Sequence, residues 1–343
     1  MKIAVIGAAV LWGTAGTAGL LVTGVDPVSL ASARLVIGGL VLAAVTAPAA
    51  RLLLSPTGSS GEAGAPDQAG TSGEAGSPGE AGAPGQAGSP GGGEGGGRRR
   101  GPGARPGPLV AAAVAVAAYQ LCYFAAVGKT GVAVGTVVAI GSGPVFTGLL
   151  SRLLDRAWPG RRWAGATAVA IAGCAVLTGG GGEVRADGVL LALLGGLLYA
   201  FYAVTAARAI GAGAPSDAVM GLMFGGAAVV MAPVLLWTGT GWLAEPRGLL
   251  TALYLGCATT ALAYFLYGRG LRTTPVATAA TLALAEPAVA ALLGVVVLGE
   301  RLAPVSVAGL VLLGASLVAV SLPGRAHPGS PGSRDRGAIG SSA

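Results

Sequence analysis

The sequence predicts an all-α polytopic membrane protein, and three observations support this. Charged residues make up only 10% of the 343-residue chain, against roughly 25% in a soluble globular protein. The mean hydropathy is +0.73. Apolar runs of about 20 residues, enough to cross a hydrocarbon core of roughly 30 Å as a helix, recur along most of the chain. These properties argue against a soluble enzyme.

Ten apolar runs separated by polar breaks predict ten transmembrane helices. The runs lie at residues 3–23, 28–48, 108–127, 131–151, 162–180, 187–208, 216–237, 247–267, 275–298 and 304–322. The first run follows Met1 and Lys2, as a signal peptide would. However, nine similar runs follow it and its small residues are not gathered at a cleavage site, which favours a first span.

The distribution of basic residues predicts the topology. The net charge is +7, but Lys and Arg lie singly or in small groups between the apolar runs, which indicates membrane orientation rather than nucleic-acid binding. With the N-terminus in the cytoplasm, sixteen basic residues face inward. Four face outward, namely Lys129, Arg185, Arg247 and Arg301. Because cytoplasmic loops carry the excess, both termini are expected in the cytoplasm, with the protein in the cell membrane.

Residues 55–107 interrupt the apolar pattern with 19 Gly and 7 Pro in 53 positions. Such a segment buries too little surface to offset the entropy of ordering, so a disordered cytoplasmic loop is predicted, and residues 323–343 form a similar tail. Residues 61–90 read as Gly-X-Y triplets broken at Asp67 and resemble collagen. A triple helix needs Gly at every third position of three chains, so a flexible linker is favoured.

Matching motifs in the two halves predict an inverted repeat. Pro144 and Pro287 lie in similar surroundings 143 residues apart, whereas Pro27 and Pro215 are 188 residues apart. The difference of 45 residues is close to the length of the predicted loop. We therefore expect two five-helix copies, residues 1–54 with 108–180, and residues 187–322. Because five is odd, the second copy enters the membrane from the opposite side.

Four segments carry a resemblance to a known family: LWG at 11–13, DPVSLASAR at 26–34, YFAAVGKTGVAVGTVVAIGSGPVF at 123–146 and LALAEPAVAALLGVVVLGERL at 282–302. Together they resemble the drug/metabolite transporter superfamily, in its EamA-domain family. The resemblance implies a ten-helix carrier of small metabolites, usually exported, with a central cavity between the copies. The first copy departs from the pattern, with Asp155 and Ala157 where a Gly-Glu pair would fall.

Two ionisable residues within predicted spans are the first functional candidates, because such groups are costly in a membrane unless paired or hydrated. Arg34 lies about six residues, roughly 9 Å, inside the outer end of its span; it either reaches the interface or contacts substrate. Glu286 lies near the midplane directly before Pro287. It either exchanges protons, which are then a coupling partner, or only holds helices together by hydrogen bonds.

Pro144 and Pro287 are candidates for matched helix breaks at the gates of an alternating-access carrier. Aromatic and amide side chains inside the spans either line the substrate pathway or pack against neighbouring helices. They are Trp12, Tyr119, Gln120, Tyr123, Tyr199, Tyr202 and Tyr264.

The remaining function classes are disfavoured. Cys122, Cys174 and Cys257 lie inside apolar runs and His327 lies in the tail, so no metal site or cofactor is expected. No DxxxD or HExxH spacing occurs within the spans, which argues against an intramembrane enzyme. The expected function is secondary transport of a small organic solute, with a channel or a structural membrane protein as the alternative.

Overall fold

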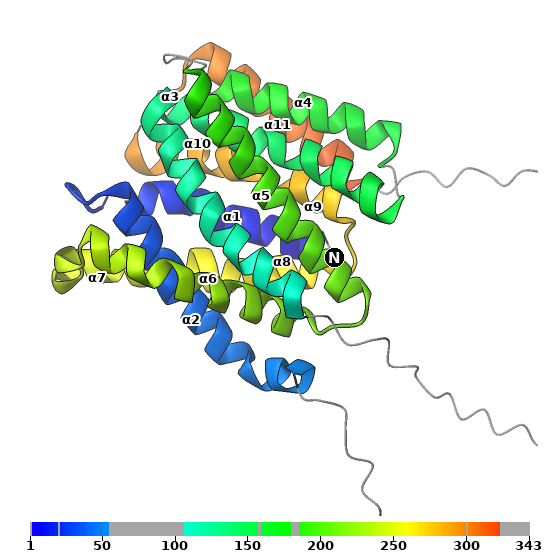
Figure 1. Ribbon diagram of the computed structural model, residues 1–343. Helices are drawn as coiled ribbons and strands as arrows, with labels where there is room; N and C mark the ends of the chain where they lie inside the picture. Colours follow the sequence, from blue (N-terminus) through cyan, green and yellow to red (C-terminus); the bar gives the residue numbers. More distant parts are fainter. Residues whose placement is uncertain are drawn as a thin grey trace, which may run out of the picture.

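The computed structural model describes residues 2–19, 21–54, 106–156, 159–179, 185–299 and 301–322, and all regular structure within these ranges is helical (Figure 1). The helices are α1 (Ile3–Gly19), α2 (Pro27–Leu54), α3 (Pro106–Asp155), α4 (Arg161–Thr178), α5 (Ala186–Gly211), α6 (Ser216–Thr238), α7 (Pro246–Leu253), α8 (Ala263–Leu271), α9 (Val276–Ala283), α10 (Ala285–Leu298) and α11 (Pro304–Ser321). The 3₁₀ turn η1 (Gly241–Ala244) precedes α7, and the π-helical segment η2 (Tyr254–Leu262) joins α7 to α8. The predicted tail and residues 55–105 of the predicted loop lie outside the described residues.

Eight helical segments within the described residues are long and apolar enough to cross a membrane. They are Pro27–Arg51, Gly107–Gly131, Val134–Asp155, Ala186–Gly211, Ser216–Thr238, Pro246–Leu271, Val276–Val297 and Pro304–Ser321. The first predicted span is α1, an apolar helix of 17 residues that ends at Gly19. The fifth predicted span is α4, whose 18 residues begin with two arginines. The structure is therefore that of a multi-pass helical membrane protein.

A kink at Gly131 divides α3 into the two expected spans. Gly131 has φ 79° and ψ 164°, a backbone conformation that residues with a side chain rarely adopt. The hydroxyl groups of Tyr123 and Thr136, on the two sides of the kink, are 2.9 Å apart. The helix begins at Pro106, two residues earlier than expected, since proline suits the first position of a helix.

The two predicted proline breaks have different outcomes. Pro287 has no N–H to donate to the carbonyl of Ala283, and the helix is interrupted there at Leu284, whose N–H instead bonds to Thr281 O at 3.1 Å. The break expected at Pro144 is wrong: α3 leaves helical geometry only at Gly131.

Tight packing explains why the helix continues through Pro144. A Cβ added at Gly143 would lie 3.0 Å from the ring of Tyr199, and one at Gly148 would overlap the ring of Trp163. Neighbouring helices thus hold the backbone on both sides of the proline. A proline in a membrane helix is tolerated where it packs on protein in this way.

Contacts between helix ends define two faces of the bundle. One face, which we call the basic face, joins the starts of α1, α4, α6 and α9 to the ends of α3, α5, α8 and α11. The contacts are Lys2 with Ser321, Arg162 with Ala319, Trp163 with Ala277, Arg208 with Asp155, and Arg269 with Asp217. The short connections at 211–216 and 271–276 lie on the same face.

The other helix ends meet on the opposite face. Lys129 at the kink of α3 pairs with Asp187 at the start of α5, at 2.8 Å. Ser29 near the start of α2 donates to the carbonyl of Gly239 beyond α6. Successive helices therefore alternate in direction, as expected for membrane spans.

Two helix pairs pack through glycine on opposite sides of the bundle, with α1 between them (Figure 1). In the α2–α6 pair, a Cβ added at Gly39 would overlap the carbonyl oxygen of Phe224. In the α4–α11 pair, a Cβ at Gly173 would lie 3.0 Å from Gly309 O, and one at Gly309 would lie 2.8 Å from Gly173 O. Small residues allow this approach, which favours helix association where the hydrophobic effect is absent.

Candidate substrate cavity

A cavity lies between α1, α2, α3, α5, α8, α9 and α10. Its lining consists of Trp12, Arg34, Tyr119, Ala139, Ile140, Tyr199, Tyr202, Tyr264, Ala280, Ala283 and Glu286. Seven of the nine substrate-pathway candidates from the sequence are therefore brought together around one space. They come from both expected five-helix copies, which makes the cavity a meeting point of the two halves.

The cavity contains one basic and one acidic side chain that are not paired with each other. Arg34 and Glu286 both line it, but no ion pair or hydrogen bond joins them among the described residues. The Nε of Arg34 is buried without a partner. Arg34 therefore points into the bundle rather than toward the interface, and Glu286 follows directly after the helix break at Leu284.

Trp12, which also lines the cavity, carries a buried polar group. Trp12 is 6% exposed, and its Nε1 is buried without a hydrogen-bond partner. An N–H group left unpaired away from water costs free energy of about 1–3 kcal/mol. An indole N–H and a guanidinium can only donate hydrogen bonds.

Aromatic rings form the remaining wall. The ring of Trp12 lies 5.0 Å from that of Tyr264 and 5.5 Å from that of Tyr267, centre to centre. The hydroxyl groups of Tyr199 and Tyr267 are 3.2 Å apart, and those of Tyr202 and Tyr264 are 3.5 Å apart. Both pairs join α5 to α8, so the wall is cross-linked by hydrogen bonds as well as by ring contacts.

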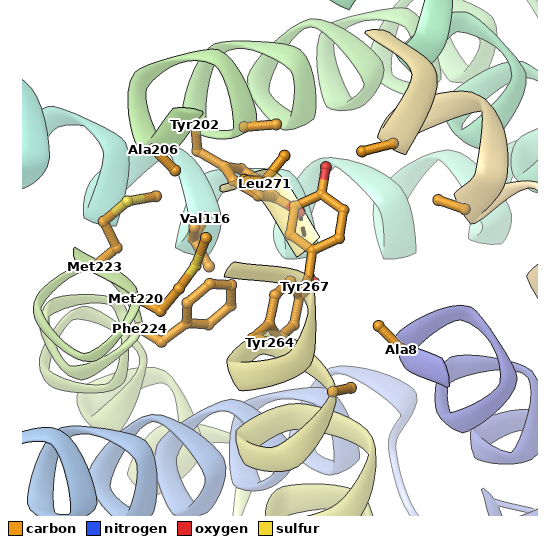
Figure 2. Close-up of a cluster of buried hydrophobic side chains, with 14 of the residues drawn as sticks. Ala8, Val116, Tyr202, Ala206, Met220, Met223, Phe224, Tyr264, Tyr267 and Leu271 are labelled. Atoms are coloured by element: carbon orange, nitrogen blue, oxygen red, sulfur yellow. Dashed lines mark hydrogen bonds between the residues drawn. The ribbon is translucent and has the colours of Figure 1, made fainter. Parts of the chain in front are cut away.

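Large buried side chains of α6 and α8 pack together beside the cavity. Figure 2 shows Met220, Met223 and Phe224 of α6 beside Tyr264 and Tyr267 of α8. All five are 8% exposed or less. All five belong to the main buried cluster of the bundle.

Toward the opposite face the packing is looser. The helix α9, on the basic-face side of the break at Leu284, buries six of its eight residues. On the other side of the break, α10 buries only Gly294 among its described residues. The bundle is thus packed asymmetrically around the cavity.

Two sequence candidates do not line the cavity. Gln120 is 5% exposed but lies outside the lining, and Tyr123 is engaged with Thr136 across the kink of α3. Conversely, sequence reasoning missed Tyr267, although it follows Tyr264 by three residues and so shares a helix face with it. The alanines that line the cavity could not be recognised from the sequence, because this chain is rich in alanine throughout.

Comparison with known proteins places this arrangement in context. The family described as "EamA-like transporter family" matches residues 186–322. A protein of Bacillus subtilis (strain 168), described as "Uncharacterized transporter YwfM", is 43% identical over 197 residues, which are 57% of this chain and 66% of that protein. The chain thus matches just under two thirds of that relative's length.

A solved structure titled only "Crystal structure of protein" has a similar fold. It is 17% identical in sequence, the match covers 93% of this chain and 96% of the other, and the TM-score is 0.69. At this identity the likeness concerns the fold alone.

Proposed function

We propose that this chain is a secondary carrier of a small organic solute, because its residues 186–322 match the EamA-like transporter family, whose members are transporters rather than enzymes. It moves the solute across the cytoplasmic membrane by alternating access, and the family resemblance implies export. The observation that carries this proposal is the cavity itself. It combines two ionisable side chains, Arg34 and Glu286, with an aromatic wall.

Ten membrane helices arranged as two inverted five-helix repeats fit this mechanism. The helices α4 and α11 each have 18 residues and begin 143 residues apart, the spacing of Pro144 and Pro287. These two helices pack against each other, and so do α2 and α6, the second helices of the two copies. A two-fold axis between the copies would pack a helix of one copy against the corresponding helix of the other in this way.

We further propose that the basic face is cytoplasmic. Its described residues include Lys2, Arg162, Arg208 and Arg269, as the excess of positive charge on the inner side requires. In this orientation both termini are in the cytoplasm.

The test of the proposed function has two steps. First, metabolites accumulated by cells lacking the protein are compared with those of cells producing it, which identifies solutes it exports. Second, flux of such a solute is measured in proteoliposomes at rising concentration. A carrier gives saturating flux because each cycle moves a bound solute. Flux that rises in proportion to concentration would favour a channel, and no flux of any solute would favour a structural role.

A further inference from the structure

We propose that a groove on the outer surface of the bundle, between α2 and the continuous segment of η2 and α8, binds an acyl chain of an anionic phospholipid whose phosphate contacts Arg269. The lining of the groove is apolar and includes Val41, Leu42, Val45, Cys257, Leu262 and Phe265. The groove shares no lining residue with the substrate cavity. It is therefore a second site, independent of what the chain carries.

The groove has the depth of one leaflet of a bilayer. It lies within Pro27–Arg51 and Pro246–Leu271, two segments long and apolar enough to cross a membrane. Cys257 lies near the middle of the second segment, and Phe265 lies six residues, about 9 Å, before its end at the basic face. The groove thus extends from near the midplane toward the headgroups of the leaflet at the basic face, which is the course of an acyl chain.

The π-helical segment η2 forms one wall of the groove. The hydroxyl group of Thr260 donates to the carbonyl oxygen of Leu255, five residues earlier, at 3.0 Å. The helix α2 approaches this segment closely at Gly38, where an added Cβ would overlap the carbonyl oxygen of Gly256. On both helices the groove residues follow this contact toward the basic face. A π-helical turn within a helix is rare and frequently marks a functional site.

A guanidinium group lies at the headgroup end of the groove. The Cζ of Arg269 is 4.1 Å from the centre of the Phe265 ring, and Phe265 lines the groove. Arg269 is one turn closer to the basic face, and its side chain is 51% exposed. A guanidinium group binds phosphate oxygens through parallel N–H donors. This end of the groove is therefore complementary to the phosphate of a lipid.

The charges around Arg269 favour an anionic headgroup over a zwitterionic one. Arg269 pairs with Asp217 at 3.3 Å. The exposed Arg272 lines a hollow of the basic face together with Asp217. Two basic groups thus lie near one acid, and their balance is positive. A positive surface attracts lipids that carry a net negative charge.

Retention of lipid by the purified full-length protein tests the proposal. The protein in detergent is incubated with an equimolar mixture of phosphatidylglycerol and phosphatidylcholine with the same acyl chains, and bound lipid is counted by native mass spectrometry. The wild type should retain phosphatidylglycerol with a preference of about fivefold, the usual contribution of one basic residue near an anionic lipid surface. Equal retention of the two lipids would overturn the proposal.

Removal of charge tests the headgroup end. Arg269→Gln should lower the preference for phosphatidylglycerol about fivefold. Arg161→Gln is the matched control, because it removes an exposed arginine of the basic face at the start of α4, and it should keep the wild-type preference. An equal loss in both variants would assign the preference to the general charge of that face and overturn the site.

Filling the groove tests the end that holds the acyl chain. Val45 is 68% exposed, so Val45→Trp adds bulk to the groove rather than to the core, and retention of phosphatidylglycerol should be lost. Val311→Trp in α11, where the valine is 64% exposed, is the matched control and should retain the lipid. Unchanged retention by Val45→Trp would place the lipid elsewhere. A lipid-free dimer that Val45→Trp dissociates would assign the groove to a second copy of the chain and also overturn the proposal.

A measurement on the wild type alone locates the acyl chain. Phosphatidylglycerol with a photoreactive diazirine near the end of one acyl chain is incorporated into proteoliposomes with the protein, and the labelled peptides are identified after illumination. Labelling should be concentrated around Cys257 and Val41, at the midplane end of the groove. Labelling spread evenly over the exposed helices would show that the groove does not select a lipid.

Discussion

Glu286 occupies the first turn of α10, directly after the break at Leu284, so a short rigid stretch holds its carboxyl at the cavity. The same residue is the acidic group that a proton could reach when the cavity is open to either side. A single side chain can therefore take part in solute binding and in energy coupling.

The variant Glu286→Gln should lose the dependence of solute accumulation on a pH gradient, because a neutral amide neither takes up nor releases a proton. Any remaining flux should be downhill. The measurement is gradient-driven flux in proteoliposomes, with Asp217→Asn as a control that removes an acid outside the cavity and should keep full gradient dependence. If Glu286→Gln responds to the gradient as the wild type does, the carrier is not proton-coupled through this residue.

At the residue scale, the charged members of the cavity could be predicted because ionisable side chains are rare in apolar spans. Arg34 and Glu286 stand out in the sequence for this reason. The small members, such as Ala139 and Ala280, could not be found. Their small side chains do not fill the cavity, but alanine is equally common where two helices pack closely, so its presence does not indicate a cavity.

At the scale of helices, close backbone contact is the main feature of the α2–α6 pair. A Cβ added at Gly39 would overlap the carbonyl oxygen of Phe224. It would also lie 2.8 Å from the methyl group of Ala228. Neither neighbour is the end of a flexible side chain, so a methyl group at this position must push the helices apart.

Gly39→Ala is expected to destabilise the protein by about 1–3 kcal/mol, the usual cost of overpacking a tight interface. The measurement is the melting temperature of the purified protein. Gly165→Ala in α4 is the matched control, since an added Cβ there meets no atom within 4 Å and alanine favours the helix. An unchanged melting temperature for Gly39→Ala would mean that α2 and α6 do not depend on this contact.

The apolar runs in the sequence predict where the helices lie, but they do not predict which proline interrupts its helix. Pro287 and Pro144 have similar sequence surroundings, yet the helix is interrupted only before the first. The difference arises from the packing of Gly143 and Gly148 against aromatic rings of other helices. A lost backbone hydrogen bond is visible in a sequence, but the tertiary contacts that compensate for it are not.

At the scale of the whole molecule, the orientation in the membrane is the first point to test. In a background with Cys122, Cys174 and Cys257 replaced by alanine, Ser77→Cys should not react with a membrane-impermeant thiol reagent in intact cells. Thr240→Cys is the matched control on the opposite face, where the residue is exposed, and it should react. The reverse pattern would invert the topology and place the basic face outside.

Deletion of residues 58–95 should leave membrane insertion and flux nearly unchanged, because the Gly- and Pro-rich composition contributes no apolar surface to the bundle. Arg98, Arg99 and Arg100 are retained to preserve the topology signal. Membrane fractions and proteoliposome flux are measured, and replacing the segment with Gly-Ser repeats of equal length separates length from sequence. Loss of the folded protein on deletion alone would assign a structural role to the segment.

The helices that flank this long connection have their main partners elsewhere. The helix α2 packs on α6 and η2, α3 packs on α5 and α6, and α2 and α3 touch each other only slightly. The cost of closing a flexible connection grows by only about 0.6 kcal/mol for each doubling of its length. Evolution could therefore lengthen this connection freely, and even a cut should be tolerated. Residues 1–57 and 96–343, produced as separate polypeptides, should assemble in the membrane into an active two-chain carrier.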